Sequence, residues 1–77
     1  MKYLVIEMQT FSNGAMSTPT YAFDAMDSAL QKYYTILASA VKSSLPMHAC
    51  ALMTNEGICL RSEHYAHEQP EPNTEEA

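Results

Sequence analysis

The sharpest group of chemically reactive side chains in this sequence comprises His48, Cys50, His64 and His67. A hairpin turning at residues 55–57 would place His48 opposite His64, with Cys50 two residues along on the same face. Imidazole nitrogen and thiolate sulfur are ligands that zinc prefers. The spacing matches no compact zinc motif, so we favour solvated histidines at the open end of the hairpin over a metal site, and we expect no cofactor.

The two cysteines, Cys50 and Cys59, are expected on opposite faces of that hairpin. A disulfide needs Cβ atoms within about 4.5 Å of each other, so this placement predicts two reduced thiols. Such thiols usually pack as small hydrophobic groups. No triad that would activate either thiol can be built from the sequence, and we expect a protein that is not an enzyme.

Alternating apolar and polar residues predict a strand over 3–11, and Asn13-Gly14 predicts a tight hairpin turn. Pro19 cannot donate a ladder hydrogen bond, so the second strand should lie at an edge of the sheet. Pairing across the two-residue turn gathers one apolar face from both strands, namely Leu4, Ile6, Met8, Tyr21 and Phe23.

A helix is expected over residues 25–42, which contain no glycine or proline. Asp24 is a suitable N-cap, with Asp27 as the acidic member of a capping box, and Pro46 marks the end of the segment. The apolar stripe that would cover a sheet consists of Met26, Leu30, Tyr33, Leu37 and Val41, flanked by Ala29, Ile36 and Ala40.

A second hairpin follows, with strands over 47–54 and 58–65 and a three-residue loop at 55–57 with Gly57 in the left-handed conformation. The element order is β-β-α-β-β. We therefore predict a single α+β domain over residues 1–67, with one helix packed on a four-stranded, mostly antiparallel sheet.

Charge is distributed unevenly along the chain. Residues 1–62 hold four acidic and four basic side chains, whereas residues 63–77 hold five glutamates and no lysine or arginine. Residues 68–77 also contain two prolines and no aromatic or β-branched apolar residue, which predicts a disordered acidic tail. Such a tail would add solubility to a neutral body, and the alternative is a tail that binds a basic partner or mimics nucleic acid.

Several function classes do not fit this composition. Four Lys and Arg residues cannot form the basic stripe that binds nucleic acid, and two glycines cannot form a phosphate-binding loop. No apolar run approaches the ~18 residues of a membrane-spanning helix, and residues 3–6 are too few for the core of a signal peptide. We expect the chain to work in the cytoplasm of a cell or as part of an assembly built there.

One helix can cover only one side of a sheet, so the other side should keep apolar residues near water. With Leu4, Ile6 and Met8 facing the helix, we expect Tyr3, Val5 and residues such as Leu52 or Met53 on the uncovered side. Tyr34, next to the core residue Tyr33, is a further candidate for a contact surface. Exposed patches of this kind mark interfaces, so we predict a homodimer or a docking contact with another protein.

Parts of the sequence also resemble a known group of proteins. The similarity lies in residues 2–10, 32–40, 43–48, 53–57 and 62–68. These segments resemble small uncharacterised proteins of phages and prophages in gut Firmicutes-type bacteria. The resemblance implies a phage context, and it carries no activity, ligand or catalytic residue.

Two functions remain open from the sequence. The first is a non-enzymatic phage accessory or virion-associated protein that binds itself or another protein, which the neutral body and the uncovered sheet side favour. The second is a small anti-defence inhibitor that occupies a host protein or sequesters a small ligand, which the acidic tail favours. Deleting residues 68–77 would distinguish a tail-dependent contact from one made by the sheet.

Overall fold

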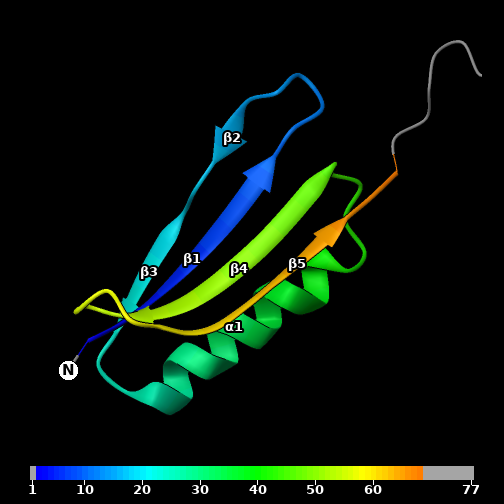
Figure 1. Cartoon of the computed structure of the whole chain (residues 1–77). Helices are drawn as coiled ribbons and strands as arrows, with labels where there is room; N and C mark the ends of the chain where they lie inside the picture. Colours follow the sequence, from blue (N-terminus) through cyan, green and yellow to red (C-terminus); the bar gives the residue numbers. More distant parts are fainter. Residues whose placement is uncertain (1, 69–77) are drawn as a thin grey trace, which may run out of the picture.

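A computed structural model describes residues 2–68 of the chain (Figure 1). It is an α+β fold in which one helix packs on a five-stranded antiparallel sheet. The elements in chain order are β1 (Tyr3–Thr10), β2 (Met16–Ser17), β3 (Thr20–Phe23), α1 (Met26–Ala40), β4 (Met47–Thr54) and β5 (Cys59–Ala66). Within the described residues, α1 is too short and too polar to cross a membrane.

Strands β1 and β4 form the centre of the sheet, with β5 beside β4 and with β2 and β3 beside the far side of β1 (Figure 1). The sequence predicted four strands, and the fifth arises because the second strand is interrupted at Thr18 and Pro19. Pro19 has no N–H, but its carbonyl accepts a hydrogen bond from the Glu7 N–H at 2.9 Å. This strand is an edge of the described sheet, as the proline predicted.

The core lies between α1 and one face of the sheet. Its members are Val5, Ala29, Tyr33, Ile36, Leu37, Cys50 and Leu52, with Tyr3, Tyr21, Phe23, Met26, Leu30 and Tyr65 packed around them. The predicted helical stripe is therefore confirmed except at Val41, which lies just past the end of α1 and is 50% exposed.

The start of α1 differs from the prediction. Its N-cap is Ala25, with no side-chain capping bond, and Asp24 instead forms a salt bridge with Lys2. The Lys2 ammonium donates a hydrogen bond to the Asp24 carboxylate, and this bond and the positive charge of Lys2 lower the pKa of the Asp24 carboxyl. Asp27 accepts from the Ser28 N–H at 2.8 Å, so the acidic first turn stabilises the helix end without a capping box.

The first hairpin has a three-residue loop where the sequence predicted a two-residue turn. Gly14 has φ +89°, no other residue of the loop has positive φ, and the Gly14 N–H donates to the Phe11 carbonyl at 2.9 Å. Asn13 Oδ1 accepts from the Ala15 N–H at 2.9 Å. The extra loop residue moves the register by one position, so Val5 pairs with Tyr21, and every side chain of β1 changes face relative to the prediction.

The second hairpin has the predicted loop. Gly57 has φ +90° and the Thr54 N–H donates to the Ile58 carbonyl at 2.9 Å. A β-bulge then shifts the register between Leu52 and Met53. Beyond the bulge His48 lies opposite Tyr65, so the prediction that His48 and His64 pair is wrong.

The predicted acidic tail begins at Glu68, an exposed residue, and otherwise lies outside the described residues.

Candidate interaction surfaces

The side of the sheet opposite α1 is an uncharged apolar surface, which we call the open face. Val5, Cys50 and Leu52 point towards α1, so the alternation of side chains places their strand neighbours on the other side. The apolar residues of the open face are Leu4, Ile6 and Met8 on β1 and Met47, Ala49, Ala51 and Met53 on β4.

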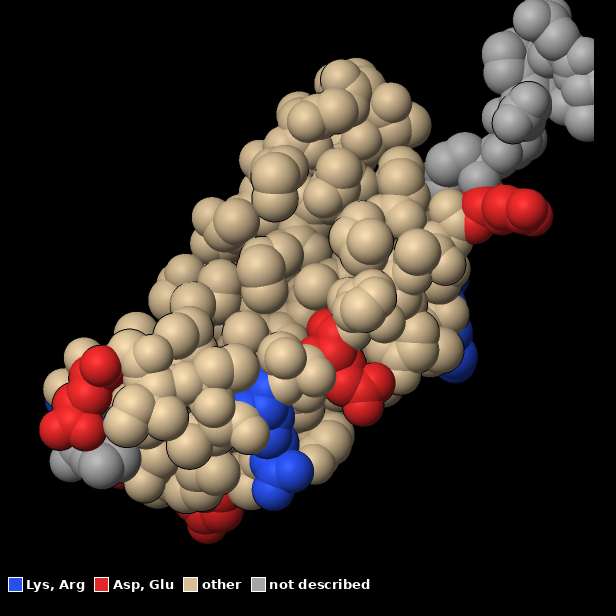
Figure 2. Space-filling view, viewed as in Figure 1, with Lys and Arg blue, Asp and Glu red and all other residues tan. Residues whose placement is uncertain are grey.

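The flanking strands add no lysine, arginine, aspartate or glutamate to the open face. They contribute Thr20, Ala22, Cys59, Ser62, His64 and Ala66. In the view of Figure 2, the surface over β1, β2 and β3 is likewise free of charged side chains, which lie towards the ends and near β5. Three of the seven apolar residues are methionines, whose unbranched side chains adapt to irregular contacts.

The predicted contact residues fall on different surfaces. The placement of Tyr3 and Val5 on the uncovered side is wrong, because the longer first loop turns both towards α1 and leaves Val5 fully buried. Of the two alternatives on the second hairpin, Met53 lies on the open face, whereas Leu52 is fully buried under α1. Tyr34 is 52% exposed on α1. Contact with a partner remains a prediction for Met53 and Tyr34.

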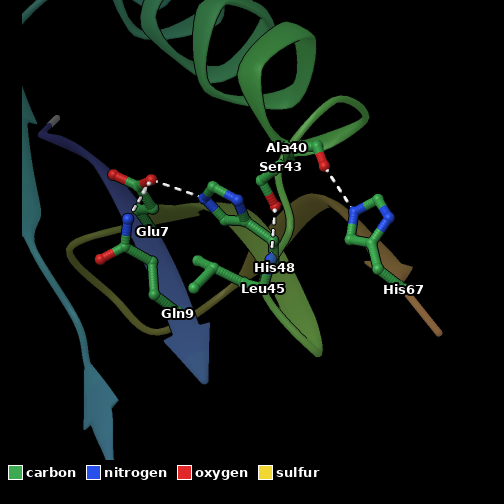
Figure 3. Close-up of polar contacts among 7 residues, drawn as sticks. All are labelled: Glu7, Gln9, Ala40, Ser43, Leu45, His48 and His67. Carbon is green, nitrogen blue, oxygen red and sulfur yellow. Dashed lines mark hydrogen bonds and ion pairs between the residues drawn. The ribbon is translucent and has the colours of Figure 1, made fainter. Parts of the chain in front are cut away.

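A polar cluster, in which His48 is buried and Glu7 and Gln9 are half-buried, lies on the covered face near the end of α1 (Figure 3). His48 Nε2 donates to Glu7 Oε2 at 2.6 Å, and Gln9 Nε2 donates to the same oxygen at 3.0 Å. The His48 and Glu7 side chains are 5% and 14% exposed, and His48 Nδ1 is buried without a partner among the described residues. This pair holds β1 to β4 through side chains as well as through the backbone ladder.

Cys50 lies two residues from His48 on the same face, but the arrangement is not that of a nucleophile. Burial, and then the charge of Glu7, raise the pKa of the Cys50 thiol to about 11. A neutral thiol with no exposed surface neither attacks a substrate nor ligates a metal readily. Both Cys50 and Cys59 are free, as predicted.

The predicted zinc candidates do not converge. His48 is bonded to Glu7 on the covered face, while His64 is exposed on the open face. His67 Nε2 donates to the Ala40 carbonyl at 2.8 Å and so ties the end of β5 to the end of α1 (Figure 3). Over residues 2–68 no group of three or more His, Cys, Asp and Glu side chains is close enough to hold a metal ion.

The outer side of β5 forms a second candidate surface. Every residue of β5 is exposed except Tyr65, which is half-buried. A cleft of about 360 Å³ lies between α1 and this strand, lined by Tyr33, Tyr34, Leu60, Arg61, Ser62 and Glu63. The rings of Tyr33 and Tyr34 meet edge to face, with centroids 5.2 Å apart.

A charged side chain of this cleft acts on the core residue Tyr33. Burial, and then the carboxylate of Glu63, raise the pKa of the Tyr33 hydroxyl. Neither Arg61 nor Glu63 has an ion pair in the described part of the chain. Sequence reasoning missed this surface because the bulge that places both charges on the helix side of β5 has no local signature.

The fold and the two surfaces define a small α+β protein with an uncharged sheet face and one long open edge. Comparisons of the chain with protein-family models, curated proteins and solved structures found no significant match.

Proposed function

We propose that this chain is a non-enzymatic phage or prophage protein that works through protein–protein interaction, with its open face docked onto an uncharged apolar surface of another protein. The observation that carries the proposal is the composition of that face, which has seven clustered apolar residues and no lysine, arginine, aspartate or glutamate. Contiguous apolar patches on small proteins mark interaction sites. The phage setting is supported by the resemblance in sequence alone.

The chemistry of the open face supports a partner that is itself apolar. A charged partner residue would lose its hydration here without gaining an opposite charge, so the face rejects charged surfaces. Met8, Met47 and Met53 can repack against a surface that is not their own mirror image. These properties favour a different protein over a second copy as the occupant of this face.

Site-specific photo-crosslinking tests the proposal. A photoreactive amino acid replaces Ile6 on the open face, and in a matched control it replaces Ser39 on the exposed side of α1. We expect the Ile6 probe to crosslink one predominant second protein in cells carrying the phage, and the Ser39 probe not to. If the Ile6 probe yields no adduct, or adducts only with further copies of this chain, the proposal is wrong.

The identity of the crosslinked protein separates the two forms of the proposal. A phage structural or assembly protein would support an accessory role. A host defence protein would instead support the alternative of a small anti-defence inhibitor. In either case Ile6→Glu should abolish crosslinking from a probe at Met53, because it buries a charge in the contact, whereas Ser39→Glu should leave it unchanged.

A further inference from the structure

Strand β5 is the longer free edge of the described sheet. The order of strands ends at β5, which runs without interruption from Cys59 to Ala66. The opposite edge is divided into strands of two and four residues by Pro19. A long edge with no proline or lysine is a template for pairing with another strand.

The backbone groups that face outward on β5 can be identified from the register. The His67 N–H donates to the Pro46 carbonyl at 3.0 Å, so the residues of β5 that bond to β4 alternate from this position. The N–H and C=O groups of Ser62, His64 and Ala66 therefore point away from β4. They form a row of donors and acceptors along the outer edge.

Two charged side chains favour a second copy of the chain as the partner of this row of backbone groups. Arg61 and Glu63 lie two residues apart on the helix side of β5, and each is exposed and without an ion pair in residues 2–68. Charges on an edge strand usually oppose pairing. Here the opposite signs allow pairing with a second copy in one register and oppose it in the neighbouring registers.

The geometry of a symmetric edge contact limits the choice of register. Two antiparallel copies of β5 are related by a two-fold axis perpendicular to the sheet, so helix-side residues oppose helix-side residues and the axis passes through one residue position. An axis at residue 61 would place Arg61 opposite Arg61, and an axis at residue 63 would place Glu63 opposite Glu63. An axis at Ser62 places Arg61 opposite Glu63 twice.

We infer that a second copy of this chain pairs antiparallel with the β5 edge, centred on Ser62, to form a continuous ten-stranded sheet. Ser62 directs its backbone N–H and C=O outward, so it forms the two central hydrogen bonds with Ser62 of the second copy. The exposed side chains nearby, Tyr34 and Leu60, border the cleft that the second strand would narrow. This inference does not rest on the proposed function, because it uses a different surface.

The symmetry of this dimer has a consequence for the open face. An axis perpendicular to the sheet leaves both copies of α1 on one side and both open faces on the other. The dimer would therefore present two apolar faces side by side to a docking partner. Two sites held at a fixed spacing bind a repeated or symmetric partner far more tightly than one site does.

Charge reversal tests the edge contact. Arg61→Glu alone and Glu63→Arg alone each place like charges opposite one another twice, and each should raise the dimer dissociation constant about tenfold or more. The double variant restores opposite charges and should return the constant to within about threefold of the original chain. Lys42→Glu is the matched control, since it reverses one exposed positive charge that is not part of β5.

Sedimentation equilibrium between about 10 μM and about 1 mM covers the range expected of a small interface. The inference is overturned if the original chain stays monomeric throughout, or if the single reversals dimerise as well as the double variant. Circular dichroism confirms that each variant is folded. Because both side chains are exposed, we expect no change in the spectra.

A disulfide trap tests the register. In a Cys59→Ser background, Ser62→Cys places two thiols opposite each other at the axis, at a Cα separation of about 5.5 Å that suits a disulfide. We expect rapid formation of a covalent dimer. His64→Cys in the same background lies opposite Leu60 and should not crosslink. Equal crosslinking of the two variants would overturn the Ser62 register, and these results are independent of any open-face partner.

Discussion

Both faces of the sheet carry apolar side chains, but only the face covered by α1 also carries carboxylates among the described residues. The face covered by α1 includes the part-buried carboxylate of Glu7 and the buried imidazole of His48, whereas the open face carries Ile6 and its apolar neighbours and no Asp, Glu, Lys or Arg. Burying polar groups costs free energy unless they are paired, and leaving apolar groups in water forfeits their burial. The contrast supports the proposal that the open face contacts a partner.

Adjacent residues on one strand make this contrast measurable. On β4, Leu52 is fully buried under α1, and Met53 lies on the open face. On β1, Val5 and Ile6 stand in the same relation. Substitutions at such neighbours share the same backbone and differ only in the face they affect.

The largest effect is expected at Leu52. Leu52→Ala removes three carbons from the centre of the core and should lower the free energy of unfolding by about 2–5 kcal/mol. A small domain has little stability to lose, so this variant should be partly unfolded at 25 °C. Urea unfolding followed by circular dichroism measures the loss.

Met53→Ala is the control for Leu52→Ala. It shortens a side chain of similar size on the open face and should cost less than half as much in the monomer. Equal losses at Leu52 and Met53 would mean that the open face is covered within the single chain, and the contrast between the faces would fail.

The second effect concerns the polar cluster on the covered face. Glu7→Ala leaves His48 Nε2 without its acceptor beside an Nδ1 that already lacks a partner in the described chain, and it should cost about 1–3 kcal/mol. Gln9→Ala removes only the outer hydrogen bond and should cost about 1 kcal/mol or less. Urea unfolding distinguishes the two.

Replacing both partners sharpens this test. The double variant Glu7→Leu/His48→Leu removes both members of the pair and leaves only the half-buried Gln9 amide without its acceptor, so it should be close to the original chain in stability. If it is as unstable as Glu7→Ala, the pair contributes more than the cost of its own burial.

Much of the fold could be predicted from the sequence. The helix, both hairpins, the edge position of the Pro19 strand and the free thiols follow from local patterns that the structure confirms. These features depend on periodicity, on turn residues and on the missing N–H of proline. Each is determined within a few residues of the chain.

The assignment of faces could not be predicted, because it depends on single residues inserted into the pairing. One extra residue in the loop at 12–14 moved Tyr3 and Val5 under α1 and brought Leu4 and Ile6 to the open face. The bulge in β5 likewise separated His48 from His64. Both faces of β1 are apolar enough to be buried, so hydrophobic pattern did not select the register.

The third effect is a pH dependence that belongs to the covered face. The pKa of Cys50 is raised from 9.0 to about 11, so the folded state favours the neutral thiol more than the unfolded state does. The resulting stability is fully present below pH 9, and it is lost as pH rises through about 11. Burial raises the pKa of Tyr33 as well, which adds a loss of the same sign above pH 10.

Unfolding in urea between pH 8 and pH 11 tests this expectation. The original chain should lose up to about 2 kcal/mol over the range. Cys50→Ala should have a shallower pH dependence, while Cys59→Ala, on the exposed side, should keep the original slope. Identical slopes for all three would exclude Cys50 as a source of the dependence.

The smallest effect is expected at Ile6. Ile6→Thr keeps a β-branched side chain on the strand, and on the open face it should change the stability of the monomer by about 1 kcal/mol or less. Val5→Thr, one residue earlier, buries a hydroxyl in the core and should cost about 1–3 kcal/mol. The order of the two losses is the informative result, because the hydropathy of the residues alone predicts the larger loss at Ile6. A larger loss of stability at Ile6 than at Val5 would mean that Ile6 is buried within the single chain. The open face would then not be available for the proposed docking.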